Sequence, residues 1–135
     1  MSCQSSVKTI EICSKRPLYS KGGATPDNFF VLSSGNLDAI SPKVGEIRAS
    51  VVLQNGTALV QGKVRFQASD DGINWTNGID LTTMVTGDGA VTGDWYSARN
   101  TFLRYIRFGV LVNNQSGTLV ELTQATLTVD LQLAG

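Results

Sequence analysis

The feature that most constrains this chain is an alternation of apolar and polar residues with a period of two. In the C-terminal run "TQATLTVDLQL" (residues 123–133), apolar side chains occupy every second position from Ala125 to Leu133, and polar ones lie between them. Successive side chains of a β-strand point to opposite faces of a sheet, so this run is typical of a strand with one face on a core and one in water.

Three earlier runs, at residues 46–54, 62–69 and 102–112, repeat the pattern. Their apolar positions, with those of the C-terminal run, are expected to form the core. The residues expected to face inward are Ile47, Ala49, Val51 and Leu53; Val64, Phe66 and Ala68; Ile106, Phe108, Val110 and Val112; and Ala125, Leu127, Val129, Leu131 and Leu133.

Turn-forming residues separate these runs. Asn55-Gly56 and Asn77-Gly78 are strong hairpin dipeptides, and the chain holds fourteen glycines against three prolines. No segment combines helical periodicity with caps at both ends. A chain of 135 residues suits one domain. We therefore predict an all-β fold, a single jelly-roll-like β-sandwich of about eight antiparallel strands.

The N-terminal region is patterned differently. A shorter strand is expected at Val7–Cys13, and the stretch Pro17–Asn28 contains two of the three prolines and a Gly-Gly but no periodicity. Residues 1–28 are accordingly interpreted as an N-terminal strand with an extended arm or long loop, and residues 29–135 as the sandwich body. The arm either folds back on its own sheet or adds its strand to the edge of a neighbour. Its expected assembly residues are Val7, Ile10 and Ile12.

The composition excludes several kinds of chemistry. The chain has no histidine, and Cys3 and Cys13 are separated by nine residues, which is not a zinc spacing. The two cysteines are either free thiols or a disulfide. We therefore expect no cofactor and no metal. Eleven basic residues balance eleven acidic ones, so there is no electrostatic reason to expect nucleic acid or membrane as a partner. A sparse, balanced charge tolerates self-association.

The N-terminal segment "MSCQSSVKTIEIC" lacks the continuous apolar core of a signal peptide, and no run approaches 18 apolar residues. We therefore expect a cytoplasmic protein or a virion component.

The stretch "VRFQASDDGINWTNG" (residues 64–78) breaks an alternating run with two carboxylates, a glycine and a tryptophan. Asp at the start of a turn accepts hydrogen bonds from backbone N–H groups two residues on, and glycine supplies a positive φ. We therefore predict a structural turn at Asp70, Asp71 and Gly72, after which Trp75 returns the chain to the sheet.

The alternative is a binding site. Asp70 and Asp71, together with Asn74 and Asp80, supply oxygens that suit calcium, although the regular calcium-loop spacing is absent. Trp75 is a candidate sugar platform if its ring is exposed.

Two motifs, "FQASDDGINW" and "LRYIRFGV", resemble discoidin-like domains, the coagulation factor V/VIII C-type modules. In that family a strand runs into Ser-Asp-Gly, a Trp follows, and an Arg-Tyr-Ile-Arg strand later crosses the core. The resemblance covers residues 66–110, a third of the chain, and similar motifs recur in phage virion proteins. It implies a jelly-roll sandwich and a non-catalytic role. The family's N-terminal Trp-containing strand and calcium loop have no counterpart here, so its ligand site is not implied. The matching residues are Ser69, Asp71, Gly72 and Trp75, then Arg104, Tyr105, Ile106 and Arg107.

Further aromatic and acidic residues complete the list of candidates. Trp95 and Tyr96, opposite Trp75, either build an aromatic groove or cap one end of the sandwich. The carboxylates that glycoside hydrolysis would need carry no recognisable signature, so we expect no enzyme. These carboxylates are Glu46, Asp80, Asp94 and Glu121.

The sequence thus favours a non-catalytic structural and interaction protein that assembles on or into a larger particle. A phage or virus component (capsid decoration, tail or baseplate) is the most concrete form, with other copies of itself and other particle proteins as partners. The alternative is a carbohydrate- or glycan-binding module.

Overall fold

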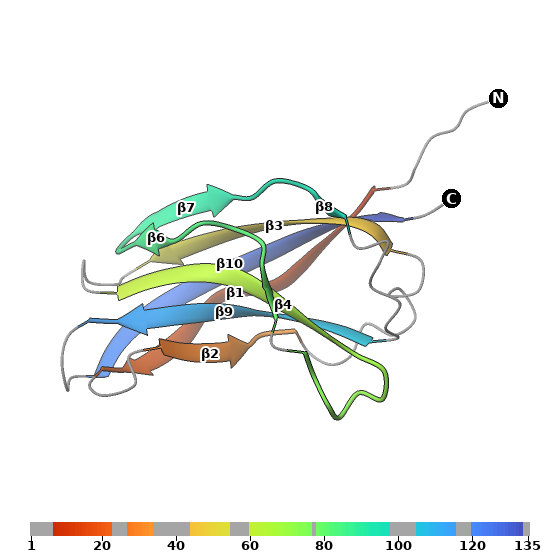
Figure 1. The fold of residues 1–135 in the computed structure, drawn as a ribbon. Coiled ribbons are helices and arrows are strands. Elements are labelled where there is room, and N and C mark those ends of the chain that lie inside the picture. The colour runs from red at the N-terminus through yellow and green to blue at the C-terminus, as the bar shows by residue number, and fades with distance from the viewer. Residues whose placement is uncertain are drawn as a thin grey trace.

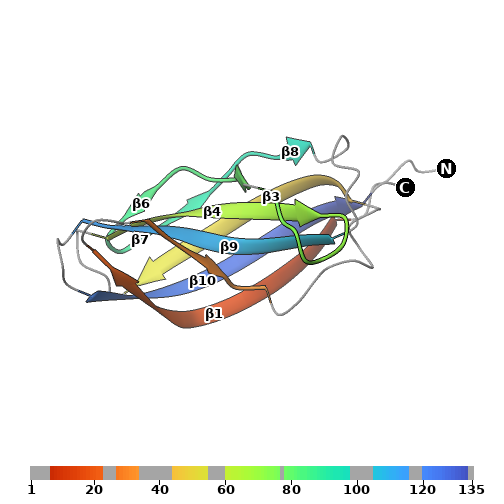
Figure 2. The same ribbon diagram turned by 60° about the horizontal axis from the view of Figure 1, so that its bottom comes forward.

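The computed structural model describes residues 7–22, 27–33, 44–54, 60–76, 78–97, 105–115 and 120–133. Over these residues the chain is a β-sandwich of two packed sheets (Figures 1 and 2). Within those ranges no helix is long and apolar enough to cross a membrane. The strands are β1 (Val7–Lys21), β2 (Asp27–Val31), β3 (Val44–Gln54), β4 (Val60–Ser69), β5 (Ile79–Asp80), β6 (Val85–Thr86), β7 (Gly89–Thr92), β8 (Tyr96–Ser97), β9 (Tyr105–Asn114) and β10 (Val120–Leu133).

Each sheet combines strands from both ends of the chain. The first sheet has the order β1-β10-β3-β7, and β8 also pairs with β3. The second sheet has the order β2-β9-β4-β5, and β6 also pairs with β4. All neighbouring strands are antiparallel. The prediction of an all-β antiparallel sandwich is therefore confirmed, with short extra strands between β4 and β9 raising the number above eight.

The core lies between the two sheets and is built by the alternation seen in the sequence. Every residue expected to face inward is at most 3% exposed, apart from Leu133, whose side chain lies outside the described part. Phe66 of β4 and Phe108 of β9 contact each other, with ring centroids 6.2 Å apart. Tyr96 of β8 reaches across from the first sheet and packs on Phe66 at 5.5 Å. Aromatic contacts of this kind thus join the two layers.

The N-terminal arm differs from the expectation. β1 does not end near Cys13 but continues to Lys21, paired with β10 along its length, so Pro17–Lys21 is strand rather than arm or loop. Two β-bulges, between Glu11 and Cys13 and between Cys13 and Arg16, interrupt the ladder. Each bulge adds one residue to β1 and so shifts the alternation of inward and outward side chains by one position. The second half of β1 therefore does not continue the period of two that predicts a strand. Leu18, beyond the second bulge, is buried in the core.

One side of the sandwich is closed by the short strands. The chain from β5 to β8 crosses from the second sheet to the first, and Gly93 lies directly against the carbonyl oxygen of Leu81. A side chain at Gly93 would collide with that backbone oxygen, so the close approach requires glycine. Hydrogen bonds from Leu81 N to Val64 O and from Gly93 N to Ala49 O, at 2.8 and 3.0 Å, tie the crossing to both sheets.

Replacement of Phe108 by alanine should reduce the free energy of unfolding by about 3–5 kcal/mol, because it removes a fully buried ring between the sheets. Thr128→Ala on the outer face of β10 is the matched control and should change stability little, since Thr128 is only half-buried and outside the core cluster. Thermal and urea unfolding of both variants would measure this. Equal losses at the two positions would contradict the assigned faces.

Candidate functional site

The loop between β4 and β5, residues 69–76, is held by hydrogen bonds within itself. The Ser69 hydroxyl accepts from the backbone N–H groups of Asp71 and Gly72, at 3.2 and 2.9 Å, and donates to the Asp71 carboxylate at 2.9 Å. Gly72 has φ +75°, the left-handed conformation that this turn was expected to require. At the base, Thr76 N donates to Ala68 O and Thr76 Oγ1 accepts from Ala68 N. The loop is therefore a rigid projection, seen as the green hairpin in Figure 1.

Asp71 is the centre of that network. Its Oδ1 accepts from the backbone N–H groups of Ile73 and Asn74, each at 2.8 Å, and its Oδ2 accepts from the Asn74 side-chain amide at 2.8 Å. These donors stabilise the ionised carboxylate, led by the Asn74 and Ile73 backbone groups, and hold the pKa of Asp71 well below its ordinary value of 3.8. Both oxygens are thus engaged inside the loop, as a turn former requires. Asp70 is exposed at the start of the loop.

The four candidate calcium ligands are not brought together as a set. Asp80 lies on β5, where it accepts from Lys63 Nζ at 2.7 Å and from Arg65 Nε at 2.8 Å. Burial raises the pKa of Asp80, but the bonds to Arg65 and Lys63 outweigh it and the net shift is downward. Within the ranges listed above, no three His, Cys, Asp or Glu side chains converge as metal ligands.

Trp75 covers the end of the second sheet. Its ring lies 4.1 Å from the guanidinium carbon of Arg107 on β9, a cation–π contact. The Arg107 Nε also donates to Gln67 Oε1 at 2.8 Å, which fixes the guanidinium across β9 and β4. Burial lowers the pKa of Arg107. Trp75 is half-buried, and its contact with Arg107 occupies one ring face.

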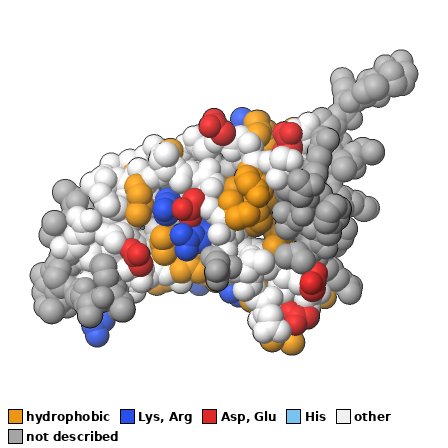
Figure 3. Space-filling model, in the orientation of Figure 1, with side chains coloured by type: hydrophobic (Ala, Val, Ile, Leu, Met, Phe, Trp, Pro, Cys, Tyr) orange, Lys and Arg blue, Asp and Glu red, His pale blue; other side chains and the backbone are white. Residues whose placement is uncertain are grey.

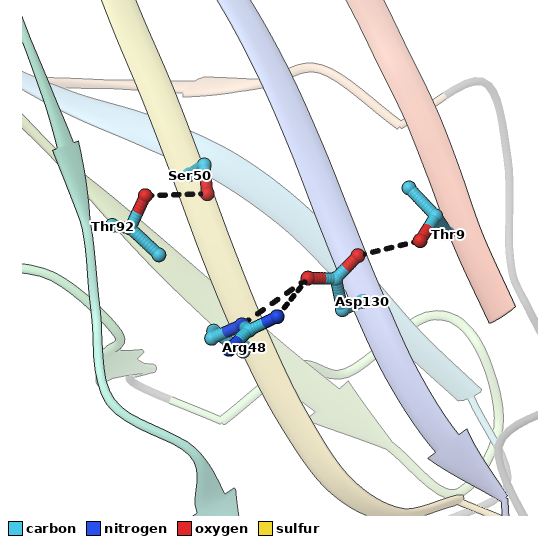
Figure 4. A network of polar contacts seen from close by, with 5 residues as sticks. All are labelled: Thr9, Arg48, Ser50, Thr92 and Asp130. Carbon is cyan, nitrogen blue, oxygen red and sulfur yellow. Dashed lines mark hydrogen bonds and ion pairs between the residues drawn. The ribbon is translucent and has the colours of Figure 1, made fainter. Parts of the chain in front are cut away.

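Trp95, between β7 and β8, has a similar partner on the first sheet. Its ring lies 4.5 Å from the guanidinium carbon of Arg48 on β3. Arg48 in turn donates to Asp130 Oδ2 of β10 at 2.9 and 3.2 Å, and Thr9 of β1 donates to Asp130 Oδ1 at 2.7 Å. Figure 4 shows this network across three strands. The hydrogen bond from Thr9 has the largest effect and lowers the pKa of Asp130. Burial raises that pKa, but the hydrogen bonds and the positive charge of Arg48 also lower it, so the net shift is downward.

The aromatic groove considered for Trp75, Trp95 and Tyr96 is not formed. The two indoles contact arginines of different sheets, and Tyr96 turns inward to Phe66. Strand β8 joins the first sheet whereas the Trp75 loop leaves the second, so of the two alternatives the aromatic groove lacks support. A hollow does lie beside Trp95, between the β5–β6 and β7–β8 segments. Its lining includes Asp80, Leu81, Val91, Asp94, Trp95 and Tyr96.

The residues of the expected assembly arm lie within β1. Val7 is 53% exposed at the start of the strand, whereas Ile10 and Ile12 are partly buried and pack against the core. Cys13 is a free thiol whose pKa is raised by burial, and Cys3 lies outside the described residues. Arg104 of the second discoidin-like motif also lies outside them, while Tyr105, Ile106 and Arg107 form the start of β9.

The outer face of the second sheet mixes charges of both signs. Lys63, Arg65 and Asp80 form the ion pairs described above, and Figure 3 shows blue and red side chains side by side in the middle of this face, with apolar ones around them. The sequence pattern does not predict Arg48 and Arg107 as partners of the tryptophans. Each arginine occupies an outward position in an alternating strand, which does not specify the aromatic ring that it contacts.

Comparison with known proteins shows the fold. No family model and no curated protein sequence matches the chain. Among solved structures, a chain of infectious bursal disease virus, Gx strain, is similar with a TM-score of 0.70 and 14% identity, over 99% of this chain and 33% of that one. The VP2 subviral particle of the same virus matches with a TM-score of 0.66 and 14% identity, over 97% and 34%. This chain therefore spans about a third of the length of those viral chains.

A CBM22-1 xylan-binding domain from Paenibacillus barcinonensis is also similar, with a TM-score of 0.50 and 11% identity, over 98% of this chain and 86% of that domain. At such identities the likeness establishes only a shared β-sandwich fold, which occurs both in chains of this virus and in a xylan-binding domain. The discoidin-like resemblance stays a resemblance of motifs.

Gly72→Ala should lower the free energy of unfolding by about 1 kcal/mol or more, because alanine is strained at φ +75°. Ile73→Ala is the matched control: Ile73 is 79% exposed, so its truncation should leave stability unchanged. Thermal unfolding of both variants measures the difference. An unchanged midpoint for Gly72→Ala would contradict the assigned turn.

Asp71 should also make stability depend on pH in the acid range. Its folded pKa is depressed, so its contribution is complete above the unfolded value near 3.8 and is lost as the pH falls toward the lower folded value. Asp71→Asn should therefore lose less stability than the wild type on acidification below that value. The melting temperatures of the wild type and of Asp71→Asn, measured as a function of pH, would test this. Melting temperatures that fall equally steeply for the two proteins below pH 3.8 would contradict it.

Proposed function

We propose that this protein is a non-catalytic structural component that associates with copies of itself and with other proteins of a larger particle, most concretely a virion. As a virion component, a single small sandwich suits a capsid decoration protein, a tail protein or a baseplate protein. The observation that carries the proposal is the likeness of nearly the whole chain, 99%, to part of a viral chain at a TM-score of 0.70. The VP2 subviral particle supports a particle-forming role for this fold.

The surface of the sandwich supports the same proposal. β1 and β7, the outer strands of the first sheet, are each paired on one side only among the described strands. Such edges offer backbone N–H and C=O groups to another chain. The balance of eleven basic and eleven acidic residues adds no overall repulsion between copies.

A non-catalytic role fits the positions of the candidate carboxylates. Glu46 is paired with Gln132 and Glu121 with Ser20, which puts the two glutamates at opposite ends of the first sheet. Asp80 and Asp94 both line the hollow beside Trp95, but Asp80 is held in ion pairs with Lys63 and Arg65. A pair of carboxylates for glycoside hydrolysis must instead flank one bond at a separation of roughly 5–10 Å.

A glycan-binding module is the second candidate, favoured by the likeness to the CBM22-1 xylan-binding domain and by the hollow beside Trp95. The discoidin-like motifs around Trp75 support the same class. The stacking of Trp75 and Trp95 on arginines occupies one face of each ring, so at most one face of each indole is left for a sugar.

Size-exclusion chromatography with light scattering tests the first proposal. We expect the intact protein to show a mass that rises with concentration to a multiple of the monomer. A chain that stays monomeric at high micromolar concentration would contradict it. A glycan array with xylan included separates the second candidate: binding that Trp95→Ala abolishes would favour a glycan module over a particle component.

A further inference from the structure

The outer face of the first sheet is divided into a polar half and an apolar half. The polar half carries the network around Asp130 and the hydrogen bond between Ser50 and Thr92 (Figure 4). The other half presents large apolar side chains to solvent. The solvated face of an antiparallel sheet is normally polar, so this half has the composition of a docking surface. Its exposed apolar residues are Tyr19, Val52, Val120 and Leu122.

Tyr19 of β1 projects furthest into solvent among these residues. Its neighbours Leu18 and Ser20 are buried, so its ring points outward, and it is 64% exposed. It is paired directly with Leu122 of β10, which also faces outward. Exposed aromatic side chains are enriched in protein–protein contacts, where they supply much of the binding energy. Tyr19 is therefore the side chain of this half that a partner would bury first.

A hollow of about 560 Å³ lies on the same face. Val52 and Ala90, which are paired across β3 and β7, supply apolar side chains to it. A volume in this range holds a small-molecule ligand, so the hollow accommodates a phenol ring. Its polar side chains can bond a phenol hydroxyl, which needs a hydrogen-bond partner when it is buried. The lining includes Lys15, Val52, Gln54, Asp88, Ala90 and Gln124.

The register of the sheet determines where the hollow lies relative to Tyr19. Tyr19 is level with Leu122 of β10. Leu53 and Gly89, which are paired with each other, both line the hollow and are level with Ala125, three residues further along β10. The hollow is thus displaced from Tyr19 by about 10 Å across the sheet, from β1 to β3, and by about 10 Å along the strands. The line that joins them runs diagonally over β10.

We propose that two copies of this chain associate face to face through this apolar half, with Tyr19 of each copy inserted in the hollow of the other. The inference rests on the proposed function, because it assigns the surfaces through which copies associate. A two-fold axis in the plane of the contact, passing over β10 between Leu122 and Gln124, generates both insertions at once, so the contact is isologous. It covers parts of both outer strands, β1 and β7. Because the line from Tyr19 to the hollow is diagonal, the strands of the two copies cross nearly at right angles, which is one of the two common arrangements of packed sheets.

Charge complementarity favours a second copy as the occupant. Lys21 is exposed and lies two residues beyond Tyr19 on the same face, and Asp88 is an exposed carboxylate on the β7 side of the hollow. The two-fold axis turns the step along β1 from Tyr19 to Lys21 into a step across the sheet toward β7, so Lys21 of each copy comes beside Asp88 of the other. Asp88 already has a contact within its own chain, but a carboxylate accepts several hydrogen bonds and has room for this one as well.

Two complementary substitutions test the proposal. Tyr19→Ala removes the side chain that enters the hollow, and Ala90→Arg fills the hollow, so each variant alone should associate at least about tenfold more weakly than the wild type. An equal mixture joins a copy that has Tyr19 to a copy that has an open hollow, so it should regain part of the association. Ile73→Ala is the matched control: Ile73 is an exposed apolar residue of the β4–β5 loop, away from this face, and its truncation should leave association unchanged. Light scattering at equal concentration measures all samples, and circular dichroism checks that each is folded.

Partial recovery in the mixture, with the control unchanged, supports the face-to-face contact. Variants that associate as tightly as the wild type, a folded mixture that regains nothing, or a control that weakens equally would overturn it. The proposed function would then stand, with the apolar half left to another protein of the particle. A wild type that is monomeric at high micromolar concentration overturns both.

If Ala90→Arg does not fold, Leu122→Ser takes its place, because Leu122 lies beside the two-fold axis and is partly exposed. Weaker association of folded Leu122→Ser and of Tyr19→Ala then supports the contact, and association equal to that of the wild type in either variant overturns it.

Discussion

The architecture depends on the position of β10 between β1 and β3. β10 pairs with β1 from Val120 to Gln132 and with β3 from Gln124 to Leu133. Its alternate residues from Ala125 to Leu131 are buried in the core. A slip of one residue would turn that apolar face outward, so burial of the core also determines the register. The same register brings Thr9, Asp130 and Arg48 into one polar network on the opposite face.

The same register determines which strands lie at the edges of the first sheet. β10 and β3 occupy its interior, and β1 and β7 are its outer strands. Lys15 of β1 and Asp88, which precedes β7, line one hollow together with Val52, Gln54 and Gln124. The net charge of zero adds no overall repulsion between copies, and the two outer strands offer backbone N–H and C=O groups for the proposed self-association.

The fold was predictable where the alternation was regular. Strands such as β4 and β10 have a clean period of two, and their inward residues are buried as expected. β1 was predicted too short because its bulges break the period, and a bulge is set by tertiary pairing that a single strand does not encode. The turn at Asp71 and Gly72 follows from local residue chemistry and could be placed from the sequence. The partners of Trp75 and Trp95 could not, since Arg107 and Arg48 come beside them only through the arrangement of strands in two sheets.

Backbone amide hydrogen exchange as a function of protein concentration tests the central claim most directly. Exchange in a sheet slows where an open edge gains a partner, so the method locates the contact without a substitution. Self-association through the outer strands of the first sheet predicts that raising the concentration increases protection in β1, in β7 or in both. Protection in these strands that stays the same at all concentrations would contradict it.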